Sequence, residues 1–378
     1  MKNRLPAVHS ARLERWLGAE RMEWIQASMR GWYGPPIHLL DVPGSVRVTK
    51  DGDFIGPFER GVFYSALDSL EDHLRSVARG LTTGRSPAIA YAGFASISDA
   101  LSRASQGFRQ NLNGGFNKVG PTGVVGATSS LWRLGNAPAA GGAPGAAPGG
   151  TAFSEATAGA FSFNNPAAGS LRLTGADVTA SIVNNSLLVY DRIFGVVKTM
   201  NSTGTEAVTG VPTRFQSTTP TSEDYAGGNF LAIEVGGTAL AATAHNWTVC
   251  TYTDQDGNTG ATLPSVTGNA SAIVDRLDMP LNQWFCPLAS GDFGVKALTQ
   301  MQCSAAVATG VIWFVIGHPL GIMSFPIVNT MFPFDWLTNR DQAPYIPNDA
   351  CIALYELIKP ATTATTYTGQ IYATSTSA

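Results

Sequence analysis

The spacing of hydrophobic residues changes near residue 113, and this change divides the chain into two regions. Before it, apolar residues recur every three or four positions in segments 10–30, 65–80 and 96–112, which is the period of an α-helix. From about residue 171 onward, short runs of Val, Ile, Thr and aromatic residues alternate with clusters of turn residues, which is typical of an all-β domain. The pattern predicts an α+β protein that is mainly β, with a helical N-terminal region followed by a large antiparallel β-region.

Helix start and stop signals support the three N-terminal helices. Ser10 can cap the first helix and Gly31 can end it. Capping boxes at 65–68 and 96–99 begin the second and third helices. We predict that the third helix continues to the Asn-Gly-Gly sequence at 113–115.

The β-region contains clear strand candidates separated by turns. Asp256-Gly257 predicts the turn of a β-hairpin. The regular strand spacing favours a β-sandwich or jelly roll. The run 311–316 is followed by Gly-His-Pro, so we expect a buried strand that enters a turn there. The clearest candidate strands are 187–193, 230–235, 247–252, 311–316 and 352–358.

Three segments are expected on this basis. Residues 1–112 form a helical and extended arm or anchor, residues 113–170 a linker with long loops, and residues 171–378 a β-sandwich assembly domain. Residues 137–150 are all Ala, Gly or Pro. Such a run has no side chains with which to build a core, so we expect it to be mobile or to lie extended across a neighbour.

Charged residues are concentrated in the N-terminal region. Residues 1–110 contain 14 Lys/Arg and 11 Asp/Glu, whereas the much longer stretch 111–378 contains 10 and 16. A β-surface with few charges is poorly protected against edge pairing and association. We therefore expect other copies of the chain to cover much of this surface. The absence of a basic stripe excludes a typical nucleic-acid-binding surface, and we expect no specific nucleic acid partner.

No sequence motif indicates catalysis, a cofactor or a metal site. The five histidines are scattered, and neither a G-x-S-x-G elbow nor a P-loop is present. We expect no enzymatic activity, no cofactor and no bound metal. The cysteines lie in apolar runs and are predicted to be small buried hydrophobic residues; they are Cys250, Cys286, Cys303 and Cys351.

One acidic cluster resembles the start of a calcium-binding loop. Asp254, Asp256 and Asn258 have the spacing of its first three ligands. The match fails at its sixth position, Thr259, and at its twelfth, Ser265. We favour turn chemistry for these residues, and the sequence leaves ion binding open.

Two pairs of neighbouring carboxylates are compatible with glycoside hydrolysis, which uses two acids. They are Asp275 with Asp278 and Asp335 with Asp341. An arginine lies between or beside the members of each pair. We therefore interpret them as local ion pairs that fix loops or subunit contacts.

Residues 297–334 contain no charged side chain, which raises the possibility of a membrane span. Pro319 and Pro326 interrupt the segment, and no Lys/Arg cluster flanks it, so we predict a buried strand and no membrane span. The N-terminus leads into a charged helix without the apolar core of a signal peptide. We expect synthesis and folding in a reducing cytoplasm.

Aromatic residues are dense between positions 284 and 336. They could form a platform for stacking sugars, or they could be strand core and interface anchors. We favour the second interpretation because aromatic residues are enriched at protein interfaces. The residues predicted to lie in assembly contacts are Trp16, Trp24, Trp32, Trp284, Trp336 and Arg340.

Three stretches resemble uncharacterised structural proteins of environmental tailed bacteriophages. They are LLVYDRIF at 187–194 and onward to 210, GGNFLAIEVGG at 227–237, and FDWLTNRDQAP at 334–344. The resemblance covers residues 110–375. It consists of these three runs and a general similarity of the sequence around them, without a diagnostic motif. It implies a virion component, of the head shell or mounted on it, and it supplies no catalytic residues.

The leading hypothesis is a structural protein of a bacteriophage-type virus particle, made in the host cytoplasm and located in the virion. It would act through contacts with copies of itself and with other virion proteins. The sequence leaves open whether it is a capsid shell subunit or a decoration protein. The alternative is a phage carbohydrate-binding or depolymerase module, with Trp284, Trp313 or Trp336 exposed in a groove.

Overall fold

The computed structural model describes residues 47–48, 54–55, 94, 96–112, 114–166, 169–211, 225, 227–337, 343–359 and 363–376. The chain divides into two compact units, Met1–Pro87 and Ala88–Ala378. In the first unit, strands β1 (Arg47–Val48) and β2 (Phe54–Ile55) pair antiparallel. The predicted helices 10–30 and 65–80 lie outside the described residues, as do Trp16, Trp24, Trp32 and Arg340.

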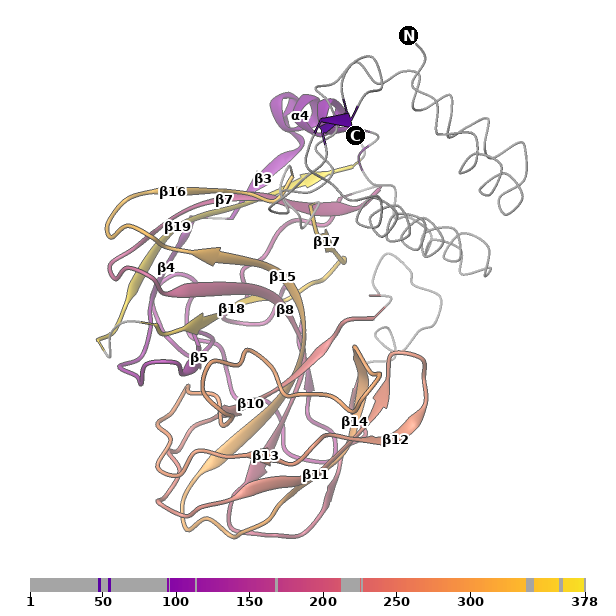
Figure 1. Ribbon diagram of the computed structural model, residues 1–378, viewed down its shortest axis with the longest axis vertical. Helices are drawn as coiled ribbons and strands as arrows, with labels where there is room; N and C mark the ends of the chain where they lie inside the picture. Colours follow the sequence, from indigo (N-terminus) through magenta and orange to yellow (C-terminus); the bar gives the residue numbers. More distant parts are fainter. Residues whose placement is uncertain are drawn as a thin grey trace, which may run out of the picture. The chain divides into compact units, whose positions relative to one another are not determined.

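The second unit consists of three antiparallel sheets (Figure 1), which confirms the predicted mainly-β fold. The central sheet has the order β10-β15-β8-β18-β5, with β6 also paired to β8. Its strands are β5 (Thr128–Ser130), β6 (Thr151–Ala152), β8 (Ser186–Thr199), β10 (Phe230–Val235), β15 (Val311–Ser324) and β18 (Ile352–Leu357).

The other two sheets are built from the remaining strands of this unit. The second sheet contains β3 (Arg109–Asn111), β4 (Phe116–Val119), β7 (Leu171–Ala180), β16 (Phe332–Asp335), β17 (Tyr345–Ile346) and β19 (Thr366–Ser375). The third sheet contains β9 (Glu206–Ala207), β11 (Asn246–Asp254), β12 (Thr259–Thr262), β13 (Val266–Thr267) and β14 (Val295–Cys303).

The long strands β8 and β15 connect two hydrophobic cores. The first core joins the central sheet to the third sheet, and the second core joins it to the second sheet. At the start of β8, Leu187 and Val189 belong to the second core, whereas Leu188 and Tyr190 belong to the first. Both faces of the strand are therefore covered. This explains why these strands are continuous apolar runs rather than alternating ones.

The structure confirms several predicted strands and one turn. β10 has the predicted bounds 230–235, and the other four candidate runs fall within or largely within β8, β11, β15 and β18. β11 and β12 form the predicted hairpin around Asp256-Gly257. Gly257 adopts a φ of +89°, which a residue without Cβ tolerates at this turn.

The third predicted helix is shorter than its hydrophobic period indicated. Ser96 caps helix α4 (Ile97–Arg103) by accepting a hydrogen bond from the Asp99 N–H at 3.0 Å, as the capping box predicts. A π-helical turn at Ala104–Phe108 follows, and Gly107 within it has a φ of +96°. The chain then becomes β3, which pairs with β19. Strand pairing with β19 overrides the helical pattern here, so the prediction of helix to 113–115 was wrong.

The predicted turn after residue 316 is also wrong, because β15 continues to Ser324. The strand stays paired with β8 through two irregularities, at Ile316/Gly317 and at Pro319/Gly321. β-Bulges of this kind bend a strand without ending it. Among the described residues, no helix has the length and apolar character needed to cross a membrane.

Residues 113–170 are part of the folded β-unit rather than a linker. β4 pairs with β19, and β5 pairs with β18. Trp132 and Phe153 belong to the first core, and Phe161 belongs to the second. The boundary between the two units accordingly lies at 87/88, not at 112/113.

The Ala/Gly/Pro run 137–150 is docked on its own chain, which corrects the expectation of a mobile or neighbour-spanning segment. Gly141 donates its N–H to the Trp132 carbonyl at 2.8 Å, and the Trp132 indole donates to the Gly142 carbonyl at 2.9 Å. Farther along, Gly145 accepts a hydrogen bond from the Val197 N–H at 2.9 Å. Main-chain hydrogen bonds thus replace the side-chain packing that this run lacks.

A buried lysine holds the start of this run. The Lys118 ammonium donates to the carbonyls of Leu134 at 2.6 Å, Pro138 at 2.8 Å and Ala139 at 3.4 Å. Burial lowers the pKa of Lys118 to about 8. All three donors of the ammonium therefore have main-chain acceptors, which offsets the cost of burying its charge.

Substituting Gly141 with Ala tests whether this run is docked. An added Cβ would lie 2.0 Å from the Trp132 ring, so we expect Gly141→Ala to lower the free energy of unfolding by about 1–3 kcal/mol. Gly142→Ala is the matched control, because its Cβ would meet nothing within 4 Å. Urea unfolding of the full-length protein measures both. Equal stability of the two variants would show that the run is not held against Trp132.

Candidate functional site

Many of the charged residues of the β-region are buried, and few are fully exposed. Among the described residues of 111–378, the exposed charged side chains are Asp256, Asp335, Asp349 and Lys359. Seven more are half-buried: Arg133, Glu155, Arg172, Asp177, Glu206, Arg276 and Asp292. The exterior of the described β-region therefore carries few fully exposed charges. The buried ones number ten: Lys118, Asp191, Arg192, Lys198, Glu234, Asp254, Asp275, Asp278, Lys296 and Glu356.

A buried ion pair joins two strands of the central sheet. Arg192 in β8 donates two parallel hydrogen bonds to Glu234 in β10, at 2.6 and 2.9 Å, across the intervening strand β15. The Tyr355 hydroxyl donates to the same carboxylate at 2.7 Å, and the Arg192 guanidinium also donates to the Tyr190 hydroxyl. Trp132 lies 4.9 Å from the guanidinium, at cation–π distance.

The adjacent carboxylate keeps the buried guanidinium of Arg192 charged. Burial works against the charge of Arg192, but the adjacent Glu234 carboxylate outweighs burial and holds the pKa of the guanidinium well above its usual value. Bidentate geometry gives a strong charge-assisted contact. Removing one partner of such a pair leaves a buried, uncompensated charge, so the pair fixes the mutual position of β8 and β10.

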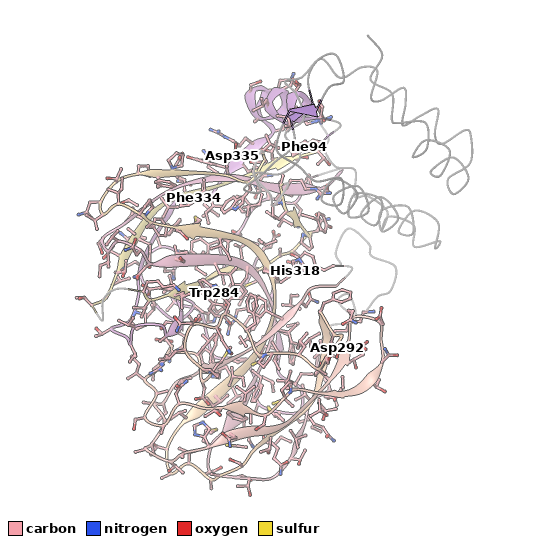
Figure 2. The ribbon with its side chains drawn as sticks, in the orientation of Figure 1. Phe94, Trp284, Asp292, His318, Phe334 and Asp335 are labelled. Atoms are coloured by element: carbon pink, nitrogen blue, oxygen red, sulfur yellow. The ribbon has the colours of Figure 1, made fainter. Side chains whose placement is uncertain are left out.

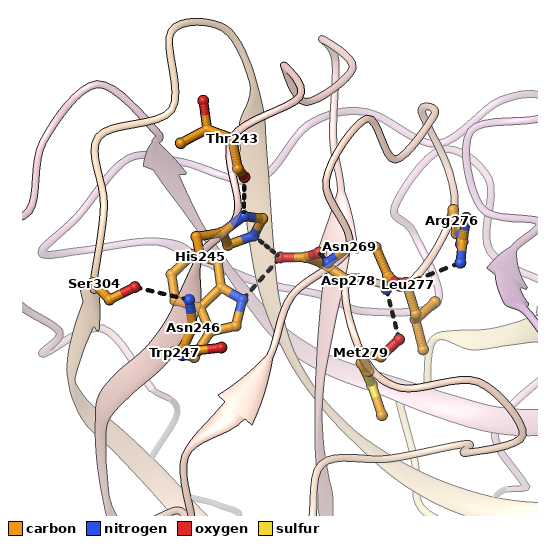
Figure 3. A network of polar contacts seen from close by, with 10 residues as sticks. All are labelled: Thr243, His245, Asn246, Trp247, Asn269, Arg276, Leu277, Asp278, Met279 and Ser304. Carbon is orange, nitrogen blue, oxygen red and sulfur yellow. Dashed lines mark hydrogen bonds and ion pairs between the residues drawn. The ribbon is translucent and has the colours of Figure 1, made fainter.

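A second cluster surrounds Asp278 (Figure 3), a residue fully buried in the first core region. His245 Nε2 and the Trp247 indole N–H both lie 2.8 Å from Asp278 Oδ2. The main-chain N–H of Asn269 donates to Oδ1 at 2.5 Å. Three groups from two separate segments therefore converge on one carboxylate.

His245 is held as a cation by this geometry. Its Nδ1 lies 3.0 Å from the Thr243 carbonyl, and its Nε2 faces the Asp278 carboxylate. Both neighbours are acceptors, and only a doubly protonated imidazole can donate to both. Burial alone would lower the pKa of His245, but the hydrogen bond and charge of Asp278 outweigh it and raise the pKa above its usual value.

This His–Asp pair does not have the arrangement of a catalytic dyad. A histidine that acts as general base needs a ring nitrogen directed at the reacting group. In His245 both nitrogens are engaged by the protein itself. The close approach also depends on Gly268, where an added Cβ would lie 2.2 Å from Nε2. The cluster fastens the segments around 243–247 and 268–279 to each other.

A third cluster lies where β8 and β15 pair at Asp191 and His318. Asp191 accepts hydrogen bonds from the Cys351 N–H at 2.9 Å and from the Tyr225 hydroxyl at 3.1 Å. The His318 ring (Figure 2) stacks on Tyr225 with 3.6 Å between centroids, and its Nδ1 lies 2.9 Å from Asn229 Oδ1. Burial lowers the pKa of His318 to about 3. The imidazole is therefore neutral.

A fourth buried acid, Glu356, is incompletely paired. Its Oε1 accepts hydrogen bonds from Asn185 at 2.9 Å and from the Tyr367 hydroxyl at 2.8 Å, whereas its Oε2 has no hydrogen-bond partner. Burial raises the pKa of Glu356 to about 7. This carboxyl therefore changes charge near neutral pH inside the protein.

Within the predicted local ion pairs at 275–278, Arg276 keeps an electrostatic interaction with Asp278, but the close contacts of the two acids go to distant segments. Asp275 Oδ1 lies 3.6 Å from Arg133 Nη1, and Asp278 contacts His245. Arg276 instead donates to the Asn269 side chain at 3.3 Å. In the second predicted pair, Asp335 is exposed at the end of β16, and Asp341 lies outside the described residues.

The geometry of the acidic cluster 254–258 is that of a turn. Asp254 Oδ1 accepts hydrogen bonds from the N–H groups of Asp256 at 2.9 Å and Asn258 at 2.8 Å, and Oδ2 accepts from the Asn258 amide at 2.8 Å. Both carboxylate oxygens are thus engaged by donors. Within the described ranges, no group of three or more His, Cys, Asp or Glu residues is placed to hold a metal ion. The four cysteines are buried and free, which confirms their predicted state.

The tryptophans predicted to lie in assembly contacts differ in exposure. Trp336 is buried in the second core, where it stacks near Phe334, so its ring has no surface left for a subunit contact. This corrects the prediction for Trp336. Trp284 (Figure 2) is half-buried and packs against the first core. Trp313 is also buried, so neither it nor Trp336 can stack on a sugar.

Comparisons with protein-family models, with curated proteins and with solved structures found no match to this chain. Its function must therefore be inferred from its own residues. The two features that stand out are the buried charged residues and the small number of fully exposed ones.

Replacing Asp278 with Asn tests the His245 cluster. The change removes the negative charge and places an NH2 group against an N–H donor, so we expect the free energy of unfolding to fall by about 2–4 kcal/mol. Asp335→Asn, at an exposed position, is the control and should change stability by less than about 0.5 kcal/mol. Denaturant unfolding at pH 6 measures both variants. Similar small effects in the two would contradict the structural role of Asp278.

Glu356 predicts a pH dependence of stability. Its pKa is about 7 in the folded state and 4.5 when unperturbed, so the folded protein binds more protons between these values. Stability is therefore fully present below pH 4.5 and falls as the pH rises through 7, by about 3 kcal/mol for this group. His245 acts in the same direction above its unperturbed pKa of 6.5.

The variant Glu356→Gln isolates this contribution. Its amide oxygen can still accept the hydrogen bonds from Asn185 and Tyr367, but the side chain no longer titrates. Unfolding free energies measured from pH 4.5 to 8 should fall less steeply in this variant than in the wild type. If the unfolding free energies of the two proteins fall equally with pH, the pKa of Glu356 is not raised in the folded state.

Proposed function

We propose that this protein is a structural subunit of a virus particle of the bacteriophage type. It acts by packing against copies of itself and against other virion proteins. The observation that carries the proposal is the charge distribution: of the charged side chains in the described β-region, ten are buried, seven are half-buried, and only Asp256, Asp335, Asp349 and Lys359 are exposed.

The physical reason is that exposed charge normally keeps a protein soluble and separate. Soluble domains carry charges over about a quarter to a third of their surface, with both signs interspersed. An exterior of Thr, Ser, Gly, Ala and Asn lacks this protection. Covering such a surface costs little desolvation free energy, because few charges are removed from water. Burial of its apolar part contributes roughly 25 cal/mol per Å² before the costs of association.

The buried clusters support the same function from the inside. The Arg192–Glu234 pair and the Asp278 network fasten distant segments within one protomer. A subunit that is rigid before it assembles spends less binding free energy on ordering itself. Two of the three stretches that resemble phage structural proteins include β8 and β10, the strands that this ion pair joins.

The proposal predicts that the full-length protein forms discrete oligomers or particles at micromolar concentration. Closed symmetric assemblies are expected because they hide complementary surfaces on every copy. Native mass spectrometry gives the copy number, and negative-stain electron microscopy shows whether rings, trimers or shells form. A protein that stays monomeric at micromolar concentration, with no particles in the micrographs, would contradict the proposal.

The alternative, a carbohydrate-binding or depolymerase module, has less support because Trp313 and Trp336 are buried. The half-buried Trp284 is the remaining ring of the three. A glycan array and a polysaccharide-cleavage assay distinguish the two functions. Glycan binding that disappears in Trp284→Ala would favour the alternative and count against a purely structural role.

A further inference from the structure

One side of the molecule presents strand edges of two sheets. β10 pairs with β15 only as far as Gly317, so no described strand covers the outer edge of β15 beyond that point. β16, which follows next in the chain, is the end strand of the second sheet and pairs only with β7 among the described strands. The two edge segments and their connecting loop (Figure 1) occupy residues 320–335, which we call the rim.

The rim carries exposed apolar side chains in close succession. Ile322 is 49% exposed, Ile327 55%, Val328 44% and Met331 54%. These four are among eleven large hydrophobic side chains that are exposed in the described part of the chain. All four lie between positions 322 and 331. Exposed apolar residues that gather in one segment point to an interaction site more strongly than single exposed residues do.

Of the usual protections of a sheet edge, charge is missing from most of the rim, whereas proline and a bulge at Pro319/Gly321 are present. Natural edge strands are guarded by charged residues, by proline or by bulges. The rim has no charged residue before Asp335, at the end of β16 (Figure 2). Pro319, just before it, and Pro333 within it each lack an N–H, so they limit strand-to-strand pairing. A contact here is therefore made by side chains rather than by an added strand.

We infer that the rim is a contact between two copies of this chain. This inference rests on the proposed function and adds the place of one subunit contact. The argument for a second copy comes from charge. A charged partner would bury its charges against the rim without ion-pair partners, which costs desolvation free energy, so an uncharged partner surface is favoured. The rim of a second copy carries no charge before Asp335, and a two-fold axis places rim against rim, apolar side chain against apolar side chain.

The test compares charge insertion inside and outside the rim in the full-length protein. The rim variant is Val328→Asp with Met331→Asp. The matched control is Val124→Asp with Val125→Asp, which are 44% and 46% exposed and lie before β5. Circular dichroism and unfolding midpoints show whether each variant keeps its fold. A milder pair, Val328→Ser with Met331→Ser, serves if the aspartates prevent folding.

Sedimentation velocity over a concentration series gives the dissociation constant of the smallest oligomer. We expect it to rise at least about tenfold in the rim variant, equivalent to 1.4 kcal/mol, and to stay within about twofold in the control. Wild-type self-association that both variants leave unchanged, or weaken equally, overturns the rim contact and leaves the proposed function standing. A monomeric wild type overturns both.

Discussion

The packing of the central sheet on both of its faces is the constraint on which the rest of the structure depends. Strands β10 and β18 are buried at every position, and β8 nearly so, so they have no solvent side on which to place a charge. Each charged residue in these strands must find a partner inside, as Arg192 and Glu234 do, or lose its charge, as Glu356 does in part near neutral pH. The packing of the central sheet on both faces therefore accounts for five of the ten buried charges, which are Asp191, Arg192, Lys198, Glu234 and Glu356.

Much of the fold could be predicted from local sequence, and each wrong prediction has an identifiable physical cause. Strand 230–235 and the Asp256-Gly257 turn were predictable because an apolar run and a turn dipeptide act locally. Residues 109–111 continue a helical period, but Gly107 and pairing with β19 end the helix, and pairing over that distance leaves no local signal. The Ala/Gly/Pro run docks through main-chain hydrogen bonds, which composition does not reveal.

The buried clusters were missed because their members are far apart in the chain. His245 and Asp278 are separated by 33 residues, and Arg276 suggested a nearer partner for Asp278. A usable signal was nevertheless present for two of the clusters: Glu234 and Glu356 are single acids within apolar runs. An acid in such a position has to be satisfied inside the fold. The uncharged stretch 297–334 could not be interpreted from composition alone. One part of it forms a buried strand, and another part forms the exposed apolar residues of the rim.

The central claim is that the charge-poor exterior of the β-region is covered by sister molecules. Electron cryo-microscopy of the native species, purified from the full-length protein, tests it most directly. The account predicts protomers that meet through uncharged surface of residues 111–378, with Asp256, Asp349 and Lys359 left facing solvent. A map in which that surface faces solvent on an isolated protomer, or in which copies meet only through residues 1–110, would contradict it.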